Sequence, residues 1–393
     1  MGAMCKAAVT NPCRWILAAL VLLSGPVMAA PKKKPTPPLQ AEYVKLLTSD
    51  PSAAGRRVLA AAGPKAGAEI DALGAVLAGS PDKAAPVLDA LAKEDSPAAA
   101  TTAAELLLKI SVGAPANGKP SRRSGLSDEL AARAATMLDH DDPFVRGLAE
   151  WALATRVGLD NDRRDFWPKP NPPAWFQRYV SLTPAQRLEC DYVRQAVAGG
   201  AHREVQALLT HGRAVAQRAQ AIAAPTPAMK QALPDLESAR DLLAQRKAYL
   251  ALRLAARAVV LSSPDLDFDR LALVTRYSCI GTHNLASYSY HPSHYRPGGD
   301  ILVRNGLAPD ARIRPALDGR LGPGHVRGID LWWDADRVCF GFTPQPGWNN
   351  GAVSDGGEYP EPTHIYEIAL DGTNLRQLTN DRKWIDLEPC YAP

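Results

Sequence analysis

The stretch from His364 to Pro393, HIYEIALDGTNLRQLTNDRKWIDLEPCYAP, gives the clearest structural signal in the chain. Apolar residues alternate from Ile365 to Leu370, which is typical of a β-strand with one buried face. Asp371-Gly372 then turns the chain, because glycine tolerates positive φ and aspartate can bond its own backbone. Leu375 to Thr379 is predicted to return as the partner strand, and Asp386 to Pro393 to begin another. The side chains on one face of the first strand are Tyr366, Ile368 and Leu370.

The same period of two is found upstream of this stretch. Leu271 to Thr275, Ile301 to Arg304 and Val338 to Phe342 have strand-like patterns, and glycines and prolines lie between them. Ser263-Pro264 marks the point where a helical period gives way to this pattern. We therefore expect residues 264–393 to form a mainly β domain.

From Leu39 to about Ser263 the pattern is helical and rich in alanine and leucine. Three helix starts stand out because a capping residue precedes a proline at the first helical position. The prolines of these starts are equally spaced, at an interval typical of HEAT or armadillo repeats. The three starts are Asp50-Pro51, Ser96-Pro97 and Asp142-Pro143.

The third start resembles the second half of a HEAT repeat. It runs Asp141-Asp142-Pro143-Phe144-Val145-Arg146, and in such a repeat Val145, Ala149 and Ala152 would face the core while Arg146 bonds the acidic turn. Residues 39–158 are therefore predicted to form a HEAT-like array, with an irregular helical domain as the alternative. Arrays of this type present surfaces to protein partners.

Residues 159–263 are predicted to add further helices that end in a long amphipathic helix from Leu236 to Leu261. One face of this helix carries leucines at helical spacing. The other face is basic and is predicted to be solvated or to bridge domains. The leucines are Leu243, Leu250, Leu254 and Leu261, and the basic residues are Arg240, Arg246, Lys247, Arg253 and Arg257.

The N-terminus has the layout of a secretory signal peptide. Basic residues precede the apolar run from Trp15 to Leu23, and a small-residue sequence ends at Ala30. We expect residues 1–30 to be cleaved on export to the periplasm or the extracellular space, which leaves no membrane span. Residues 31–38, PKKKPTPP, are predicted to be an extended linker.

Composition narrows the range of partners. The formal charge of +4 includes Lys6 and Arg14 of the predicted signal peptide, so the remaining chain is close to neutral and nucleic acid is not an expected partner. An oxidising compartment permits disulfides among the four cysteines that follow the predicted cleavage site. The four are Cys190, Cys279, Cys339 and Cys390, and the sequence does not show which of them pair.

The β domain resembles the TolB-like propeller repeat, on the turn Asp371-Gly372-Thr373, on Leu378-Thr379 and on the pair Pro389 and Tyr391. More narrowly, about residues 250–393 are similar to a group of exported bacterial proteins that share a domain with the hydrazine synthase alpha subunit. The segments that carry this likeness are Ser263 to Leu271, Arg276-Tyr277, Arg296 to Ile301, and Ile365-Tyr366 through Glu388 to Tyr391. The resemblance implies one full propeller blade with flanking strands, and further blades or a protein partner to complete the ring.

An internal repeat supports that interpretation. Ile329-Asp330-Leu331 recurs as Ile385-Asp386-Leu387, so we expect both to occupy the same place in successive blades. The fold class is thus α+β and multidomain, with an all-α helical repeat followed by an incomplete all-β propeller segment.

Two loops contain the candidate site residues. A histidine and tyrosine cluster can supply ligands to a metal ion or to non-covalent haem, with loop packing as the alternative. The chain has no CxxCH motif for covalent haem attachment. A second, Asn- and Trp-containing insertion is predicted to bind a polar small molecule or peptide, or to be a plain surface loop. The residues are His283, His291, His294 and Tyr295 in the cluster, and Trp348, Asn349, Asn350 and Asp355 in the insertion.

Three functions follow from these observations. The first is an exported, non-catalytic binding or scaffold protein that needs no cofactor, because no catalytic motif can be picked out. The second is a metal- or haem-associated redox component related to the hydrazine synthase alpha subunit. The third is a cell-envelope carbohydrate binder that uses Trp167, Trp175 or Trp348. The alternative for Trp167 and Trp175, which lie among prolines, is that they pin a long connection to the body of a domain.

Overall fold

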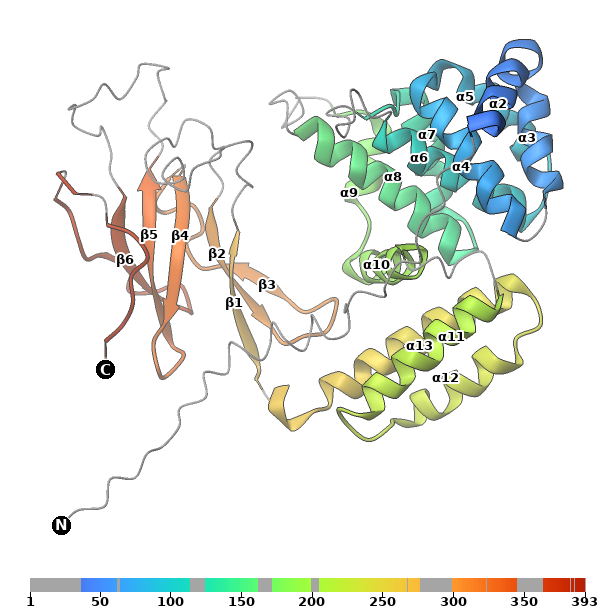
Figure 1. Ribbon diagram of the computed structural model, residues 1–393. Coiled ribbons are helices and arrows are strands. Elements are labelled where there is room, and N and C mark those ends of the chain that lie inside the picture. The colour runs from blue at the N-terminus through green and yellow to red at the C-terminus, as the bar shows by residue number, and fades with distance from the viewer. Residues whose placement is uncertain are drawn as a thin grey trace. The chain divides into compact units, whose positions relative to one another are not determined.

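The chain divides into two compact units, with the boundary between Leu266 and Asp267. A computed structural model describes residues 37–61, 64–113, 124–161, 172–198, 205–266, 268–275, 299–322, 324–344, 363–381, 383–384 and 386–392. In these ranges the first unit is helical and the second contains small antiparallel sheets, so the layout is α+β (Figure 1). A search of the same ranges for a helix long and apolar enough to cross a membrane finds none.

The helices of the first unit are short and regular, and most begin at a proline. α2 starts at Pro37, so the last two residues of the predicted linker are helical. The bounds are α2 Pro37–Ser49, α3 Pro51–Ala60, α4 Pro64–Gly79, α5 Ala84–Ala92, α6 Pro97–Val112, α7 Asp128–Thr136, α8 Pro143–Asn161, α9 Ala174–Val180, α10 Pro184–Ala198, α11 Val205–Gln220, α12 Pro227–Ser238 and α13 Leu242–Leu261.

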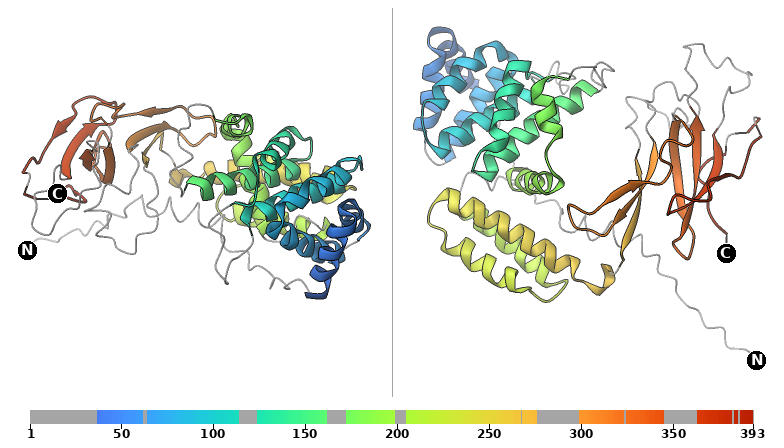
Figure 2. Two further views of the ribbon diagram at one scale, coloured as in Figure 1. Left: turned by 90° about the horizontal axis from the view of Figure 1, so that it is seen from above. Right: turned by 180° about the vertical axis from the view of Figure 1, so that it is seen from behind.

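Alternate helices of the first unit pack against one another. α2, α4, α6, α8 and α10 follow in one row, in which each helix contacts the next (Figure 1). α3 packs on α5, and α7 packs on α9, so these helices stand outside the row and form the other side of the unit. Figure 2 shows the same chain from two further directions. A continuous apolar core runs between them, from Tyr43 of α2 to Trp175 of α9.

The three predicted helix starts are confirmed, together with their caps. The Asp50 carboxylate accepts from the Ala53 amide at 3.1 Å and the Ser96 hydroxyl from the Ala99 amide at 3.2 Å. The Asp142 carboxylate accepts from the Phe144 amide at 2.8 Å. Each cap satisfies an amide that has no partner within its helix.

The equal spacing of the three prolines does not mark one structural period. Pro97 and Pro143 begin α6 and α8, which are neighbours in the same row. Pro51 begins α3, which belongs to the other side. Two prolines can be equally far apart along the chain and still begin helices in different places. The helices and turns between Pro51 and Pro97 happen to give the same interval as those between Pro97 and Pro143.

The predicted environment of α8 is confirmed in its main features. Val145, Ala149 and Ala152 are fully buried. Arg146 does bond the acidic turn, but through the carbonyl oxygens of His140 at 2.8 Å and Asp141 at 3.3 Å. The Asp142 carboxylate is instead occupied by an arginine from α13.

The prediction of one long helix from Leu236 to Leu261 is wrong. α12 ends at Ser238, and Asp241 caps the new helix α13 by accepting from the Ala244 amide at 2.8 Å. Aspartate at this position favours a helix start over a helix interior, because its carboxylate bonds the backbone.

The predicted solvated face is wrong for two of its five basic residues. Arg246 and Arg253 are buried, at 1% and 4% exposure, while Leu254 is 39% exposed. Arg240 and Lys247 are exposed, as predicted. The two arginines lie inside because each finds polar partners there, which hydrophobic periodicity alone does not reveal. The apolar side chains that join them in the core include Tyr249, Leu252, Ala256 and Val259.

A polar chain runs through the core formed by α10, α11 and α13. The Tyr249 hydroxyl bonds Nδ1 of His211 at 2.8 Å, and Arg253 donates to that hydroxyl at 3.1 Å and to Gln195 at 2.6 Å. Burial, and then the positive charges of Arg253 and Arg218, lower the pKa of His211 to about 4. The imidazole is therefore neutral in the folded chain at physiological pH.

Within the described ranges, the strands of the second unit form two antiparallel sheets in chain order, β1-β2-β3 and β4-β5-β6-β7. The predicted strands that precede Asp386 are confirmed within one or two residues. A register shift between Arg327 and Ile329 bends β4. The bounds are β1 Arg270–Thr275, β2 Asp300–Asn305, β3 Ile313–Pro315, β4 Gly324–Leu331, β5 Arg337–Pro344, β6 His364–Ala369 and β7 Arg376–Gln377.

The two sheets of this unit share one apolar core. Val338, Phe340 and Phe342 of β5 point into it, together with Ile301 and Val303 of β2. The predicted inward face of β6 also lies here, since Ile368 and Leu370 are buried and Tyr366 packs against the cluster. The turn at Asp371-Gly372 is confirmed, with φ of +89° at Gly372.

The prediction that Asp386 to Pro393 begins another strand is wrong for the described residues. Asp386 to Ala392 has no strand, and its residues bond back onto the sheet that precedes them. The Asp386 amide donates to the Thr363 carbonyl at 3.0 Å, and the Tyr391 amide donates to the Asp330 carboxylate at 2.8 Å. The two copies of the Ile-Asp-Leu repeat are therefore not equivalent: Asp386 and Leu387 lie in irregular chain, whereas Ile329 to Leu331 end β4.

The contact of α8 with α10 depends on a glycine. A Cβ at Gly147 would lie 2.5 Å from Cβ of Val193, whereas a Cβ at Gly158 on the same helix would meet nothing within 4 Å. We expect Gly147→Ala to lower the free energy of unfolding by about 1–2 kcal/mol, because overpacking outweighs the gain in helix propensity. Gly158→Ala, the matched control, should raise it by about 0.5–1 kcal/mol. Denaturant unfolding followed by the helical signal measures both, and equal effects of the two variants would contradict the packing.

Acid should weaken the core that contains His211. Because its pKa is lowered from 6.5 in the folded state, the unfolded chain binds a proton that the folded chain does not as pH falls from 6.5 toward 4. The free energy of unfolding is then highest above pH 6.5 and declines below it. In His211→Asn this decline should become shallower, which urea unfolding at several pH values between 7.5 and 4.5 measures. Parallel profiles for the two proteins would refute the assignment.

Candidate functional site

The site residues predicted from the sequence lie outside the described ranges. This holds for the cluster of His283, His291, His294 and Tyr295, and for the insertion residues Trp348, Asn349, Asn350 and Asp355. Both sites stay predictions. Over the ranges that are described, no group of three or more histidine, cysteine or carboxylate side chains is arranged to hold a metal ion.

One of the proposed sugar-stacking residues has a structural role. Trp175 is 3% exposed, and its indole nitrogen donates to the Asp128 carboxylate at 3.0 Å. The guanidinium of Arg156 lies over the indole at 4.5 Å. Trp175 thus belongs to the core of the first unit, which confirms the alternative that it is packed into the domain and makes the sugar-stacking prediction wrong for this residue. Trp167 lies outside the described residues.

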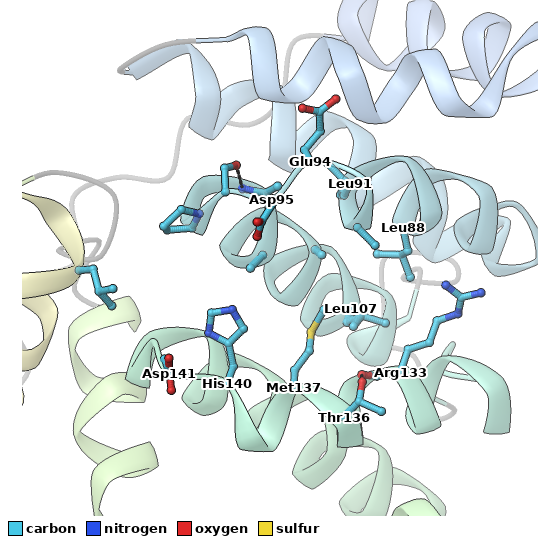
Figure 3. Close-up of a pocket in the computed structure, with 17 residues that line it drawn as sticks. Leu88, Leu91, Glu94, Asp95, Leu107, Arg133, Thr136, Met137, His140 and Asp141 are labelled. Atoms are coloured by element: carbon cyan, nitrogen blue, oxygen red, sulfur yellow. Dashed lines mark hydrogen bonds between the residues drawn. The ribbon is translucent and has the colours of Figure 1, made fainter.

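A pocket of about 490 Å³ opens in the first unit, a size typical of ligand sites. Its walls come from the end of α5, the first turns of α6, the end of α7 and the turn before α8, and Leu243 of α13 closes one side. Leu91, Ala103 and Leu107 form a buried apolar floor. Figure 3 shows Glu94 and Asp95 on one wall, across the pocket from Met137, His140 and Asp141.

The acidic wall is formed by the tight connection between α5 and α6. The Ser96 amide donates to the Glu94 carbonyl at 2.7 Å, and the Ser96 hydroxyl caps α6. This geometry holds Glu94 and Asp95 at the rim, with both residues exposed. Pro97 then sets the direction of α6 away from the rim, because its fixed φ suits the first helical position.

The opposite wall is held by hydrogen bonds on both sides of His140. Its Nδ1 accepts from the Asp142 amide at 2.9 Å, and its carbonyl accepts from Arg146 at 2.8 Å. Since Nδ1 is an acceptor, the neutral ring carries its proton on Nε2 and can donate from there. The ring points toward the pocket (Figure 3).

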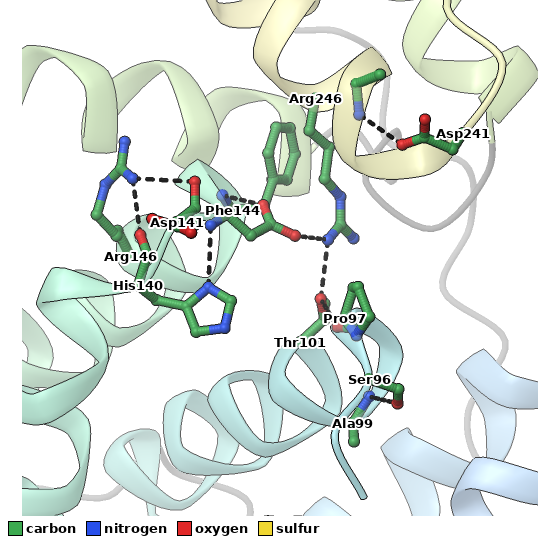
Figure 4. Close-up of polar contacts among 12 residues, drawn as sticks. Ser96, Pro97, Ala99, Thr101, His140, Asp141, Phe144, Arg146, Asp241 and Arg246 are labelled. Atoms are coloured by element: carbon green, nitrogen blue, oxygen red, sulfur yellow. Dashed lines mark hydrogen bonds and ion pairs between the residues drawn. The ribbon is translucent and has the colours of Figure 1, made fainter.

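An ion pair behind this wall fixes its position. Arg246 donates to the Asp142 carboxylate at 2.5 Å and to the Thr101 hydroxyl at 2.8 Å (Figure 4). Its guanidinium also lies 5.0 Å from the centre of the Phe144 ring. Leu243 precedes Arg246 on the same face of α13, so the ion pair also holds the apolar residue that closes the pocket.

The rim of the pocket is negatively charged. Glu94, Asp95 and Asp141 form no ion pair with any side chain in the described ranges. The one arginine of the lining, Arg133, is paired with Asp89 at 2.5 Å and with Glu129 at 3.2 Å, which offsets its charge. An apolar floor below unpaired carboxylates favours a ligand that combines an apolar group with a positive charge.

The sequence contains a signal for this pocket. Asp95-Ser96-Pro97 and Asp141-Asp142-Pro143 predict helix starts, and both turns line the pocket. Their shared pattern places exposed carboxylates just before a helix, and the packing of α6 on α8 brings the two turns face to face. The sequence alone does not show that these two turns are neighbours, because this depends on how α6 packs on α8.

Comparisons of the chain with models of protein families, with curated proteins and with solved structures found no match.

Proposed function

We propose that this chain is an exported binding or scaffold protein that binds a partner segment in the pocket of its helical unit. The observation that carries the proposal is the apolar floor of Leu91, Ala103 and Leu107 beneath the unpaired carboxylates of Glu94, Asp95 and Asp141. Export rests on the pattern of residues 1–30 in the sequence.

The helical unit is, in this proposal, a short HEAT-like array. Support comes from the row of alternate helices α2, α4, α6, α8 and α10, in which each helix packs on the next. Arrays of this kind bury a continuous core and leave the turns between helices free to bind partners. The pocket lies among such turns, between α5 and α6 and before α8.

The second unit is, in the same proposal, a segment of a TolB-like propeller similar to the domain of the hydrazine synthase alpha subunit. Its four-stranded sheet β4-β5-β6-β7 follows the chain order of a propeller blade, and a second antiparallel sheet shares its core. The residues that carry the sequence likeness include Asp371-Gly372-Thr373, which forms the turn after β6.

The expected ligand is an extended or helical peptide that places an apolar side chain on the pocket floor and a lysine or arginine at the rim. Apolar burial supplies affinity, and the carboxylates supply selectivity for positive charge. Binding should weaken as salt is added, because the rim carboxylates are exposed and their charges are screened.

Selection from a displayed random-peptide library tests the proposal. Peptides selected on the full chain should be enriched in a basic residue next to an apolar one, and Asp95→Lys should weaken their binding at least about tenfold. Asp82→Lys is the matched control, because Asp82 is exposed at the N-terminus of another helical segment and is not part of the pocket. It should leave affinity unchanged.

Two outcomes would contradict the proposal. The first is that the selected peptides have no basic residue in common. The second is that they bind the Asp95→Lys and Asp82→Lys proteins equally well. Circular dichroism of both variants shows whether each retains its helical fold, so that loss of binding is not confused with loss of structure.

A further inference from the structure

The second unit contains a free cysteine in the middle of its larger sheet. Cys339 lies on β5 directly opposite Asp330 of β4 on one side and Glu367 of β6 on the other. Directly opposed residues point to the same face of a sheet, so the three side chains form a row across this face. Cys339 is 3% exposed and is not in a disulfide.

Tyr391 is bonded to both neighbours of Cys339 in this row. Its amide donates to the Asp330 carboxylate at 2.8 Å, and its hydroxyl donates to the Glu367 carboxylate, also at 2.8 Å. Since Asp330 and Glu367 flank Cys339, Tyr391 spans the position of that cysteine. The residue before Tyr391 in the chain is Cys390, which is exposed and also free.

Further contacts hold the same segment on this face. Cα of Glu388 would lie 3.1 Å from a Cβ at Gly328, which shows how closely the segment approaches β4. The Tyr391 ring packs edge-to-face on Trp332, with ring centres 4.9 Å apart. The segment from Asp386 to Tyr391 therefore crosses the sheet at a defined place.

Asp330 is a shared neighbour of the two thiols. Burial, and then the charge of Asp330, raise the pKa of Cys339, and the charge of Asp330 raises the pKa of Cys390. Both effects require the sulfurs to lie near the same carboxylate. They also favour the protonated thiols, so exchange with a disulfide should be slow at neutral pH and faster at alkaline pH.

We propose that Cys339 and Cys390 form a disulfide when the chain meets a thiol-disulfide oxidant, and that this bond fastens the segment 386–392 to the sheet. The proposal does not depend on the binding function of the helical unit. The oxidant is a low-molecular-weight disulfide such as oxidised glutathione, which an oxidising compartment supplies.

The chemistry proceeds in two exchange steps. The thiolate of the exposed Cys390 attacks one sulfur of oxidised glutathione, which breaks its S–S bond and releases one glutathione thiolate. The thiolate of Cys339 then attacks the Cys390 sulfur of the mixed disulfide and releases the second glutathione thiolate. The two thiol protons pass to the two glutathione thiolates, so two cysteines are oxidised and one glutathione disulfide is reduced.

Other cysteines provide the controls. Cys190 is buried on α10 in the helical unit, where burial and then the charge of Glu150 raise its pKa to about 12, so it should stay a thiol. Cys279 lies outside the described residues and is the competitor to be tested for pairing with Cys390.

The test uses the full chain, reduced and then equilibrated with oxidised and reduced glutathione at mildly alkaline pH. After acid quenching, alkylation and proteolysis, mass spectrometry should find a peptide pair joined through Cys339 and Cys390, with Cys190 alkylated. The pair should be absent from Cys390→Ser and Cys339→Ser and present in Cys190→Ser. In an alkylation time course without oxidant, Cys390 should react well before Cys339, because only Cys390 is exposed.

Thermal unfolding provides a second readout. Reduction should lower the melting temperature of the second unit in the oxidised wild type, because a cross-link that closes a long loop restricts the unfolded chain. Reduction should have no such effect on Cys390→Ser, which replaces an exposed residue and keeps the fold. The proposal is overturned if both cysteines stay alkylatable after equilibration, or if Cys390 is found joined to Cys279 or to glutathione alone.

Discussion

The buried ion pair between Asp142 and Arg246 is the interaction on which the helical unit depends. Both residues are 1% exposed, and taking two charges out of water costs several kcal/mol for each ion unless their remaining polar groups are satisfied. Asp142 also accepts from the Phe144 amide, and Arg246 also donates to the Thr101 hydroxyl, which offsets part of this cost. Three helices, α6, α8 and α13, are therefore joined at one point, and removal of either partner would leave the other charge buried and unpaired.

The pocket depends on the same ion pair. The ion pair holds the turn before α8, and this turn places His140 and Asp141 on one wall. The ion pair also holds α13, which brings Leu243 to the edge of the pocket. The opposite wall is set by the cap of α6, whose Thr101 is the second acceptor of Arg246. The walls of the pocket are thus supported from behind by buried polar contacts.

Local features of the fold could be predicted from the sequence, and long-range ones could not. The caps at Asp50, Ser96 and Asp142 and the turn at Asp371-Gly372 follow from residue chemistry within a few positions. Arg246 was assigned to a solvated face, because nothing near it in the sequence indicates that Asp142 and Thr101 lie within reach. Equal spacing of three prolines suggested one period, but helix pairing assigns Pro51 to the other side. The pocket was missed for the same reason, since its two acidic turns meet only when α6 packs on α8.

The most direct test of this account is a double-mutant cycle on the ion pair, with unfolding followed by the helical circular dichroism signal. Asp142→Asn keeps the cap on α8 and removes the charge, and Arg246→Met keeps the apolar stem and removes the guanidinium. Each single variant should lose roughly 3–5 kcal/mol, and the double variant should lose less than the sum, with a coupling of at least about 1 kcal/mol. Losses that add to within about 0.5 kcal/mol would show that the two side chains do not act together, and would contradict the account.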